Sequence, residues 1–391
     1  MSSRTIVLRW TVRGGAAVVT AALTAAWLPG VAGAQAVRPG AAPVSRPAAN
    51  PYSPAAGHSY RHGVVPTIGR ERQMRRWAST HPLPAAAAHR SELDVSFGGG
   101  VHRQGVTTGH EKVYLVFWGS QWGAKSVNGS GDVTLAGDPS GEAPYLQEMF
   151  KGLGTGGEQW SGVMTQYCDG VKYGSFSCPA SARHVAYPTG GALAGVWADE
   201  RAASPENATG SQLGAEAIAA ARHFGNTTSG ANRDAQYVIL SPTGAHPDGF
   251  NTPTGEFCAW HDDTADPNLP AGPVPGKLDV AFTNMPYVTD LGISCGEDFV
   301  NAGPAGLADG MSIVEGHEYA ETITDQYPPA GWTNALTGAE AADLCAWNPP
   351  GGSGGTNDLK LTTGTFAMQS IWSNDDHGGR CEFLHPVVGN G

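Results

Sequence analysis

The sequence predicts an α/β or α+β protein in which helices pack against a layered sheet. Two runs of β-branched and aromatic residues, 112–119 and 236–241, are typical of buried central strands, and 278–282 is a third candidate strand. The segments 142–151 and 211–224 carry apolar residues at helical spacing. Because strands alternate with helices along the chain, we expect a layered sheet with packed helices.

Composition and charge exclude two classes of protein. With 40% hydrophobic residues among 391, the chain can bury a large core, so disorder throughout is excluded. Residues 91–391 hold 12 Lys and Arg against 34 Asp and Glu, a formal net charge of −22. Such a surface repels phosphate backbones, so we expect no nucleic-acid partner.

The first 34 residues are typical of a secretory signal peptide. Arg4, Arg9 and Arg13 precede an uncharged apolar stretch at 16–28, and the small residues at 32–34 suit cleavage after residue 34. The apolar stretch has about 13 residues, fewer than the ~20 that span a bilayer. We therefore expect a secreted, extracellular monomer with no membrane span after signal cleavage.

The segment that follows the leader, residues 35–92, is rich in Ala, Pro and Arg and lacks sustained periodicity. We interpret it as a pro-segment or linker, and residues 93–391 as one globular domain. The basic cluster at 70–77 could form a short helix that docks on the acidic body as a cleavable inhibitory or folding pro-region. The alternative is a solvated spacer, and the sequence leaves both open.

Six cysteines fit an exported chain, because an even count in an oxidising compartment predicts disulfides. No C-x-x-C pair occurs, so neither a zinc ribbon nor a thioredoxin-type site has support. Six cysteines allow about 15 connectivities, and sequence alone does not choose among them. We expect nearest-neighbour pairing of Cys168, Cys178, Cys258, Cys295, Cys345 and Cys381.

The stretch 312–325 is the most informative part of the chain. Ser312 and Glu315 have the spacing of a capping box, an apolar stripe follows, and Pro328 ends the run soon after, so we expect a helix of three to four turns. His317 then lies one turn from Glu321 on one face. A charged face of this kind is often only solvated, and that interpretation stays open beside a metal site.

The spacing around His317 predicts a metal site. His317, Glu318 and Glu321 reproduce an H-E-x-x-H helix with its second His replaced by Glu, so Glu318 takes the place of the residue that activates water. A catalytic zinc needs a third protein ligand. Eighteen residues separate Glu321 from Glu340, which we expect on a following helix capped by Thr337. One His and two carboxylates nearly cancel the charge of Zn²⁺ and also admit Mn²⁺ or Ca²⁺.

Two resemblances cover these residues. The pattern His317-Glu318-x-x-Glu321 followed by Glu340-x-x-Asp343 resembles the glutamate-zincin metallopeptidases with one ligand changed, and it implies a zincin-like domain with a zinc cofactor. Asp343 is placed to accept the free N–H of His317 as an outer partner. The blocks 97–101, 113–122 and 316–325 together resemble exordium or phosphate-induced proteins and their bacterial relatives. That family is secreted and implicated in growth and the cell wall, without an assigned chemistry.

Other polar residues are weaker candidates. His377 lies in a Gly-rich loop that a Cys345–Cys381 disulfide would bring beside Glu340, where it could stabilise an oxyanion, as could Arg380 or Tyr319. No G-x-S-x-G occurs, and the cysteines are expected in disulfides, so serine and thiol hydrolases have no support. The remaining clusters could bind metal, but clusters of this kind are more often polar loops, which we expect here: His110 with Glu111, His246, and His261 with Asp262 and Asp263.

Three hypotheses of function follow. The first is a secreted zinc-dependent hydrolase of extracellular peptides or proteins, with Glu318 as general base. The second is a non-catalytic exordium-like protein that binds a structural metal or a cell-wall polymer. The third is a carboxylate-pair glycosidase, for which tryptophans could stack on sugar rings. Those tryptophans are Trp118, Trp122, Trp160, Trp197 and Trp260.

Overall fold

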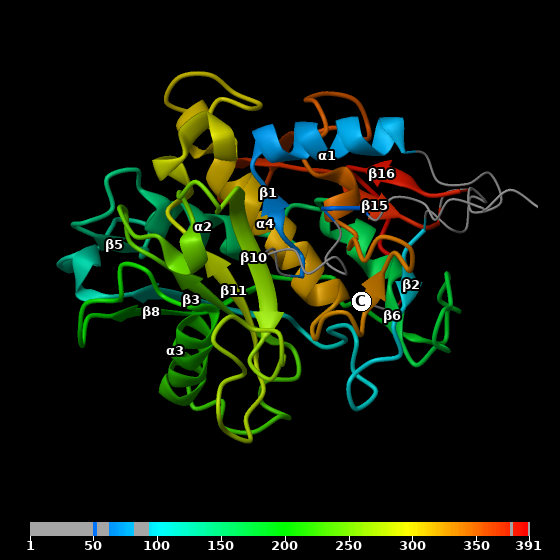
Figure 1. Ribbon diagram of the computed structural model, residues 1–391, viewed down its shortest axis with the longest axis horizontal. Coiled ribbons are helices and arrows are strands. Elements are labelled where there is room, and N and C mark those ends of the chain that lie inside the picture. Colours follow the sequence, from blue (N-terminus) through cyan, green and yellow to red (C-terminus); the bar gives the residue numbers. More distant parts are fainter. Residues whose placement is uncertain (1–49, 53–61, 82–93, 376–377, 390–391) are drawn as a thin grey trace, which may run out of the picture. The chain divides into compact units, whose positions relative to one another are not determined.

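A mixed six-stranded sheet with helices on both faces forms the centre of the molecule (Figure 1), which confirms the predicted fold class. The computed structural model describes residues 50–52, 62–81, 94–375 and 378–389. The predicted signal peptide lies outside these residues, as does much of the predicted pro-segment. The helices are α1 (Ile68–Thr80), α2 (Glu142–Gly152), α3 (Gly210–His223) and α4 (Asp309–Thr324).

The strand order of the central sheet is β1-β10-β11-β9-β3-β8. The strands β11, β9, β3 and β8 are parallel to one another. Strand β10 runs antiparallel to β11, and β1 runs antiparallel to β10. The antiparallel end of the sheet is therefore built from β10 with the short β1 on its outer edge. The strands are β1 (Val65–Pro66), β3 (Lys112–Trp118), β8 (Leu193–Asp199), β9 (Ala235–Leu240), β10 (Phe257–Asp263) and β11 (Ala281–Met285).

The predicted central strands are confirmed at β3 and β9, which lie side by side in the middle of the sheet. The third candidate, 278–282, is shifted: β11 begins at Ala281, where its register with Gln236 of β9 starts. Long-range pairing with β9 and β10, which no local pattern reveals, sets that start. The predicted helices agree with α2 and α3 to within one residue.

The two faces of the sheet are covered by different helices. Phe224, at the end of α3, packs on Tyr114 of β3, which stacks on Tyr237 of β9. On the opposite face α4 lies against β10 and β11, and Phe150 of α2 meets Tyr319 of α4 edge-on. Helix α4 is thus enclosed between the sheet and α2.

Helix α4 differs from its predicted form at its start. It begins at Asp309, and the capping box of Ser312 with Glu315 does not form, because the Ser312 hydroxyl donates to the Ala367 carbonyl and Glu315 is buried. The Asp309 carboxylate instead accepts the backbone N–H groups of Val300 and Asn301. Every residue of α4 is buried, so its polar side chains are not a solvated face.

Short two-stranded ribbons surround the central sheet. Their strands pair antiparallel, and several tie the carboxyl-terminal third of the chain to the body. The ribbons are β2 (Ser96–Phe97) with β12 (Trp332–Thr333), β4 (Lys125–Val127) with β5 (Val133–Leu135), β6 (Cys168–Asp169) with β7 (Arg183–His184), β13 (Asn357–Lys360) with β14 (Thr365–Met368), and β15 (Ile371–Ser373) with β16 (Arg380–Glu382).

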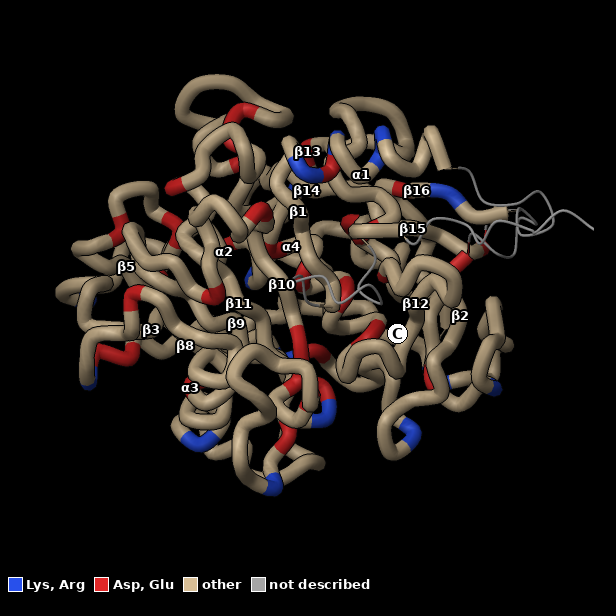
Figure 2. Tube along the Cα trace, in the orientation of Figure 1, with Lys and Arg blue, Asp and Glu red and all other residues tan. Residues whose placement is uncertain are grey.

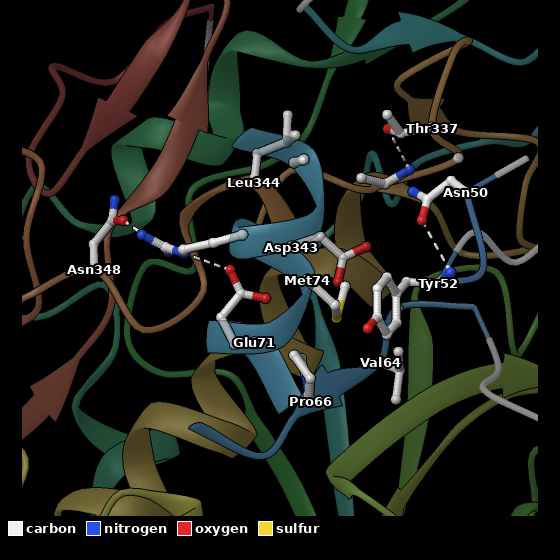
Figure 3. A pocket seen from close by; sticks show the side chains of 15 residues that line it. Asn50, Tyr52, Val64, Pro66, Glu71, Met74, Thr337, Asp343, Leu344 and Asn348 are labelled. Atoms are coloured by element: carbon white, nitrogen blue, oxygen red, sulfur yellow. Dashed lines mark hydrogen bonds and ion pairs between the residues drawn. The ribbon is translucent and has the colours of Figure 1, made fainter. Parts of the chain in front are cut away.

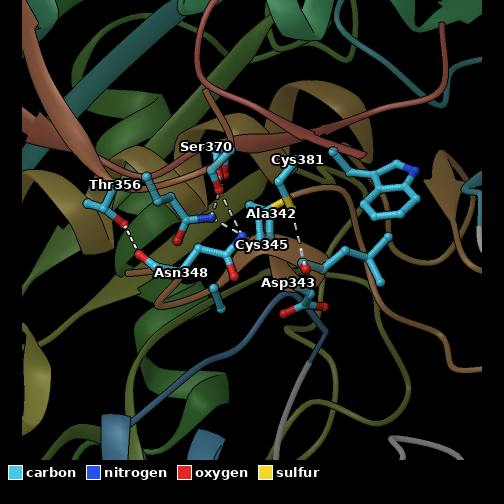
Figure 4. Close-up of a disulfide and its surroundings, with 12 residues drawn as sticks. Ala342, Asp343, Cys345, Asn348, Thr356, Ser370 and Cys381 are labelled. Atoms are coloured by element: carbon cyan, nitrogen blue, oxygen red, sulfur yellow. Dashed lines mark hydrogen bonds between the residues drawn. A yellow bond between two sulfur atoms is a disulfide. The ribbon is translucent and has the colours of Figure 1, made fainter. Parts of the chain in front are cut away.

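Three disulfides staple the fold, and their nearest-neighbour pairing is confirmed: Cys168–Cys178, Cys258–Cys295 and Cys345–Cys381. The second links β10 to the turn that contains Cys295. The third links β16 to the turn that contains Asp343 and Cys345 (Figure 4). Disulfides of this kind typically stabilise by about 2–4 kcal/mol each and are typical of oxidising compartments. Within the described residues, no helix has both the length and the apolar character needed to cross a membrane.

Most tryptophans considered for sugar stacking serve the core instead. Trp122, Trp160 and Trp260 are fully buried. Trp197 is partly exposed, but its ring stacks on His223 with 4.3 Å between ring centroids and lies under the Arg201 guanidinium. The three buried rings cannot stack on a sugar, so the glycosidase hypothesis keeps support only from Trp118 and Trp197, which are partly exposed.

Candidate metal centre

Helix α4 presents the predicted pair of side chains to the core. His317 Nε2 lies 3.2 Å from Glu321 Oε2, one turn along the helix, and both side chains are fully buried. Glu318 lies beside them and is also buried. The local helix geometry therefore forms as the spacing predicts.

Strand β10 contributes a second imidazole. The prediction of a polar loop at His261 is wrong, because this residue lies in β10, fully buried, opposite Thr283 of β11. Its Nε2 atom is 3.2 Å from Glu340 Oε2 and 3.8 Å from Glu321 Oε2. The apolar run at 257–260 just before His261 was the sequence signal for this strand.

Glu340 lies at the site but not on a helix. It precedes a short 3-10 turn at Asp343–Cys345, and Thr337 does not cap a helix, because its hydroxyl donates to Asn334 Oδ1. The physical reason is that the backbone here hydrogen-bonds the carboxylate of Glu321 and does not continue a helix. The N–H groups of Ala342 and Asp343 donate to Glu321 Oε1 over 3.1 and 2.7 Å, which fixes the orientation of that carboxylate.

The outer partner of His317 is Gln369, which sequence reasoning missed. Gln369 Oε1 lies 3.0 Å from His317 Nδ1, so this ring nitrogen donates to the amide oxygen. Gln369 is itself held, because its amide donates to the Ala342 carbonyl and its own carbonyl accepts the Trp160 indole N–H. Asp343, expected in this role, lies on the other side of the ring, with Oδ1 3.7 Å from Nε2.

Two overlapping groups of side chains could hold a metal ion. In each group the potential ligand atoms all lie within 4.8 Å of one another. His261, Glu318 and Glu321 make the first group, and His317, Glu321 and Asp343 the second. Glu321 is common to both, whereas Glu340 adjoins the cluster through His261.

The atoms that face the cluster lack other partners. Among the described side chains, buried atoms without a hydrogen bond include His317 Nε2, both oxygens of Glu318, Glu321 Oε2 and Glu340 Oε1. Leaving such groups unpaired costs about 1–3 kcal/mol each, and more for charged groups. Ligands of a tetrahedral Zn²⁺ at ~2.0–2.1 Å lie roughly 3.3 Å apart. Glu321 Oε2 lies 3.2 Å from His317 Nε2 and 3.8 Å from His261 Nε2, close to this spacing, while the two imidazoles belong to different groups.

Burial and neighbouring charges shift the pKa values of the clustered side chains. Burial raises the pKa of Glu318 and of Glu340 well above the usual range. Burial by itself lowers the pKa of His317, but the charges of Glu321, Asp343 and Glu318 outweigh it and raise that pKa well above its usual value. His261 behaves differently, since burial lowers its pKa to about 3. A neutral imidazole is the form that ligates a metal.

The remaining candidates lie apart from this cluster or outside the description. His377 lies outside the described residues. The Tyr319 ring packs between Phe150 and Trp160 in the core, and Arg380 pairs with Glu382 on β16. Among the described residues the only groups that could hold a metal are the two at Glu321, so neither His246 nor His110 belongs to one.

Gln369→Ala should weaken the binding of a divalent metal, measured with added Zn²⁺, about 10–100-fold, because outer partners that orient a ligating imidazole typically contribute that much. The measurement is competition with a zinc chelator of known affinity. Gln166→Ala is the matched control, since Gln166 is another buried amide and hydrogen-bonds the backbone of Asn374 away from the cluster. Equal zinc affinity in the two variants would show that Gln369 does not orient His317.

Comparisons with protein-family models, with curated proteins and with solved structures return no match for this chain. The site therefore has to be interpreted from its own residues.

Proposed function

We propose that this chain is a secreted, metal-dependent hydrolase that cleaves extracellular peptides or proteins. The observation that carries the proposal is Glu318, a fully buried carboxylate whose two oxygens have no hydrogen-bond partner beside a cluster of two imidazoles and further carboxylates. Other buried glutamates of the described residues also leave both oxygens unpartnered, but among them only Glu318 belongs to a group that could hold a metal.

Each residue has a role that its contacts support. A bound divalent ion would act as a Lewis acid and lower the pKa of water. Glu321, held by two backbone N–H groups, is the central ligand, because it belongs to both groups; His317 would be the imidazole ligand of one group and His261 that of the other. Glu318 accepts a proton at its unpartnered carboxylate and passes it to the leaving group. Gln369 keeps His317 in the tautomer that presents Nε2 to the cluster.

Zinc is the metal that we propose. The sequence-predicted set of one His and two carboxylates nearly neutralises a divalent ion and favours harder metals. His261, in the other group, lies 3.8 Å from the shared Glu321, so an ion at Glu321 that drew in both imidazoles would have two imidazole donors and one carboxylate, a set typical of catalytic zinc. Such a set leaves net positive charge on the ion, so its polarising power is retained.

The experiment combines metal content with reaction class. The full chain, stripped of metal and titrated with Zn²⁺, Mn²⁺ and Ca²⁺ by calorimetry, should bind one equivalent of Zn²⁺ most tightly. Digestion of a peptide library should stop with a chelator and return with added Zn²⁺. Digestion that a chelator does not affect would contradict the proposal. Zinc binding without any cleavage would instead favour the non-catalytic exordium-like protein with a structural metal.

A further inference from the structure

The candidate metal centre is covered by the chain's own amino-terminal segment, residues 62–81. Gly63 packs directly on it: a Cβ added to Gly63 would overlap both the His261 ring and the Glu321 carboxylate. Its φ of +52° also favours glycine. The backbone at Gly63 therefore lies against two of the proposed ligands, where a substrate would have to lie.

The same segment adds a strand to the sheet. Val65 and Pro66 of β1 pair antiparallel with Ala259 and Phe257 of β10, the strand that carries His261. The Trp347 indole N–H donates to the Pro66 carbonyl over 2.7 Å. Strand addition of this kind is how extended peptides commonly bind an open sheet edge. Without β1, the outer edge of β10 would be open beside His261.

Helix α1 closes the segment over the site with polar contacts and with Ile68, which packs partly buried against the core. None of its residues is buried. Arg75 Nη2 donates to the Ala346 carbonyl over 2.6 Å and to Asn348, next to the turn that holds Asp343. Between α1 and this turn lies a cavity of about 480 Å³, in which Glu71 and Met74 lie near Asp343 (Figure 3). The cavity therefore reaches a proposed metal-binding group from the α1 side.

Charge and burial suit a segment that can leave. Helix α1 carries four arginines and one glutamate, and it lies on a body where acidic positions predominate (Figure 2). Within 62–81 only Gly63, Val65 and Pro66 are buried. Exposed ion pairs contribute about 0–1 kcal/mol each, and a two-residue strand adds few hydrogen bonds. Electrostatic attraction between the basic helix and the acidic body thus favours docking of the segment. The few buried residues make its release less costly.

We propose that residues 62–81 are an autoinhibitory segment that occupies the substrate-binding groove of the metal centre through β1 and is fastened by Arg75 of α1. The inference rests on the proposed function, since it names how that site is regulated. A substrate reaches His261 and Glu321 only after this segment leaves the edge of β10.

The test uses two substitutions in the full chain. Arg75→Ala removes the fastening contact, and Val65→Asp places a charge at a fully buried position of β1. Arg72→Ala on the exposed side of α1 is the matched control. We measure the rate at which a chelator removes Zn²⁺, amide hydrogen exchange in β10, and peptide hydrolysis. Both variants should increase all three, Arg75→Ala by about tenfold because it removes two hydrogen bonds of a charged side chain, and Val65→Asp by more because it places an unpaired charge at a buried position.

Addition of a synthetic peptide of residues 62–81 to the Val65→Asp chain should restore slow zinc loss and low hydrolysis. A Val65→Asp chain that exposes β10 to exchange but keeps the zinc-loss and hydrolysis rates of the parent overturns the inference. So does a cooperative loss of the whole fold in that chain, since the segment would then be part of the core. If zinc loss accelerates and the peptide reverses it, yet no variant hydrolyses peptides, the covering role stands and the proposed hydrolase activity fails.

Discussion

Glu318→Gln should lower peptide hydrolysis by about 10²–10⁴-fold while zinc stays bound, because a positioned general base contributes that much and glutamine cannot accept the proton. The change preserves the shape of a fully buried side chain. We therefore expect the midpoint of thermal unfolding to change little relative to the parent chain. The measurement is kcat/KM in the Arg75→Ala background, together with zinc content by mass spectrometry.

The matched control for that experiment is Glu315→Gln. Glu315 lies one turn earlier on α4 and is likewise buried with both oxygens unpartnered, but it belongs to neither group that could hold a metal. It should keep both zinc and activity. Full activity in Glu318→Gln would move the base elsewhere. Loss of zinc in Glu318→Gln would make Glu318 a ligand, as its place in the group with His261 and Glu321 also permits.

His261→Ala should weaken zinc binding by more than the roughly 10–100-fold expected for an outer partner, because it removes a proposed direct ligand. The imidazole is fully buried, and its Nε2 lies between Glu340 and Glu321, so no solvent-exposed group can replace it without moving. Calorimetric titration with Zn²⁺ and chelator competition give the affinity.

His246→Ala controls for the loss of one histidine. His246 lies in a turn, with Nδ1 3.1 Å from the Phe250 carbonyl, and belongs to neither metal group. We expect unchanged zinc affinity in this control. If His261→Ala also binds zinc as the parent does, the ion is held by the group of His317, Glu321 and Asp343 alone. Zinc affinity of Glu340→Gln would then distinguish that group from the set predicted from sequence. Only the predicted set includes Glu340, so only that set would lose affinity.

The sequence was most informative where structure is local. A run of β-branched residues and a helical spacing of apolar residues depend on neighbours within a few positions, so β3, β9, α2 and α3 form where they are predicted. The same holds for His317 and Glu321, which one helical turn brings together whatever the rest of the chain does. The basic cluster at 70–77, for which the sequence left a short helix and a solvated spacer both open, lies within α1.

Helix ends and loops were predicted less well, because tertiary contacts compete with local signals there. Ser312 has the sequence of a cap, but the carbonyl of Ala367, 55 residues away, takes its hydroxyl. Thr337 has the sequence of another cap, but the backbone at Ala342 and Asp343 turns toward Glu321 and does not continue a helix. In both cases a buried polar partner outweighs a capping preference of about 1 kcal/mol.

The sequence by itself determined the fold class and the pair of side chains on α4 that begins the site; for the six cysteines it favoured nearest-neighbour pairing without deciding it. Only the tertiary structure decided what completes it. His261 comes from β10, Gln369 hydrogen-bonds the Nδ1 atom of His317, and the backbone at Gly63 packs against His261 and Glu321. The physical reason is distance along the chain. His261 and Gln369 are 56 and 52 positions from His317 along the chain. They lie near it only because sheet pairing and packing enclose α4, and no local sequence pattern predicts such contacts.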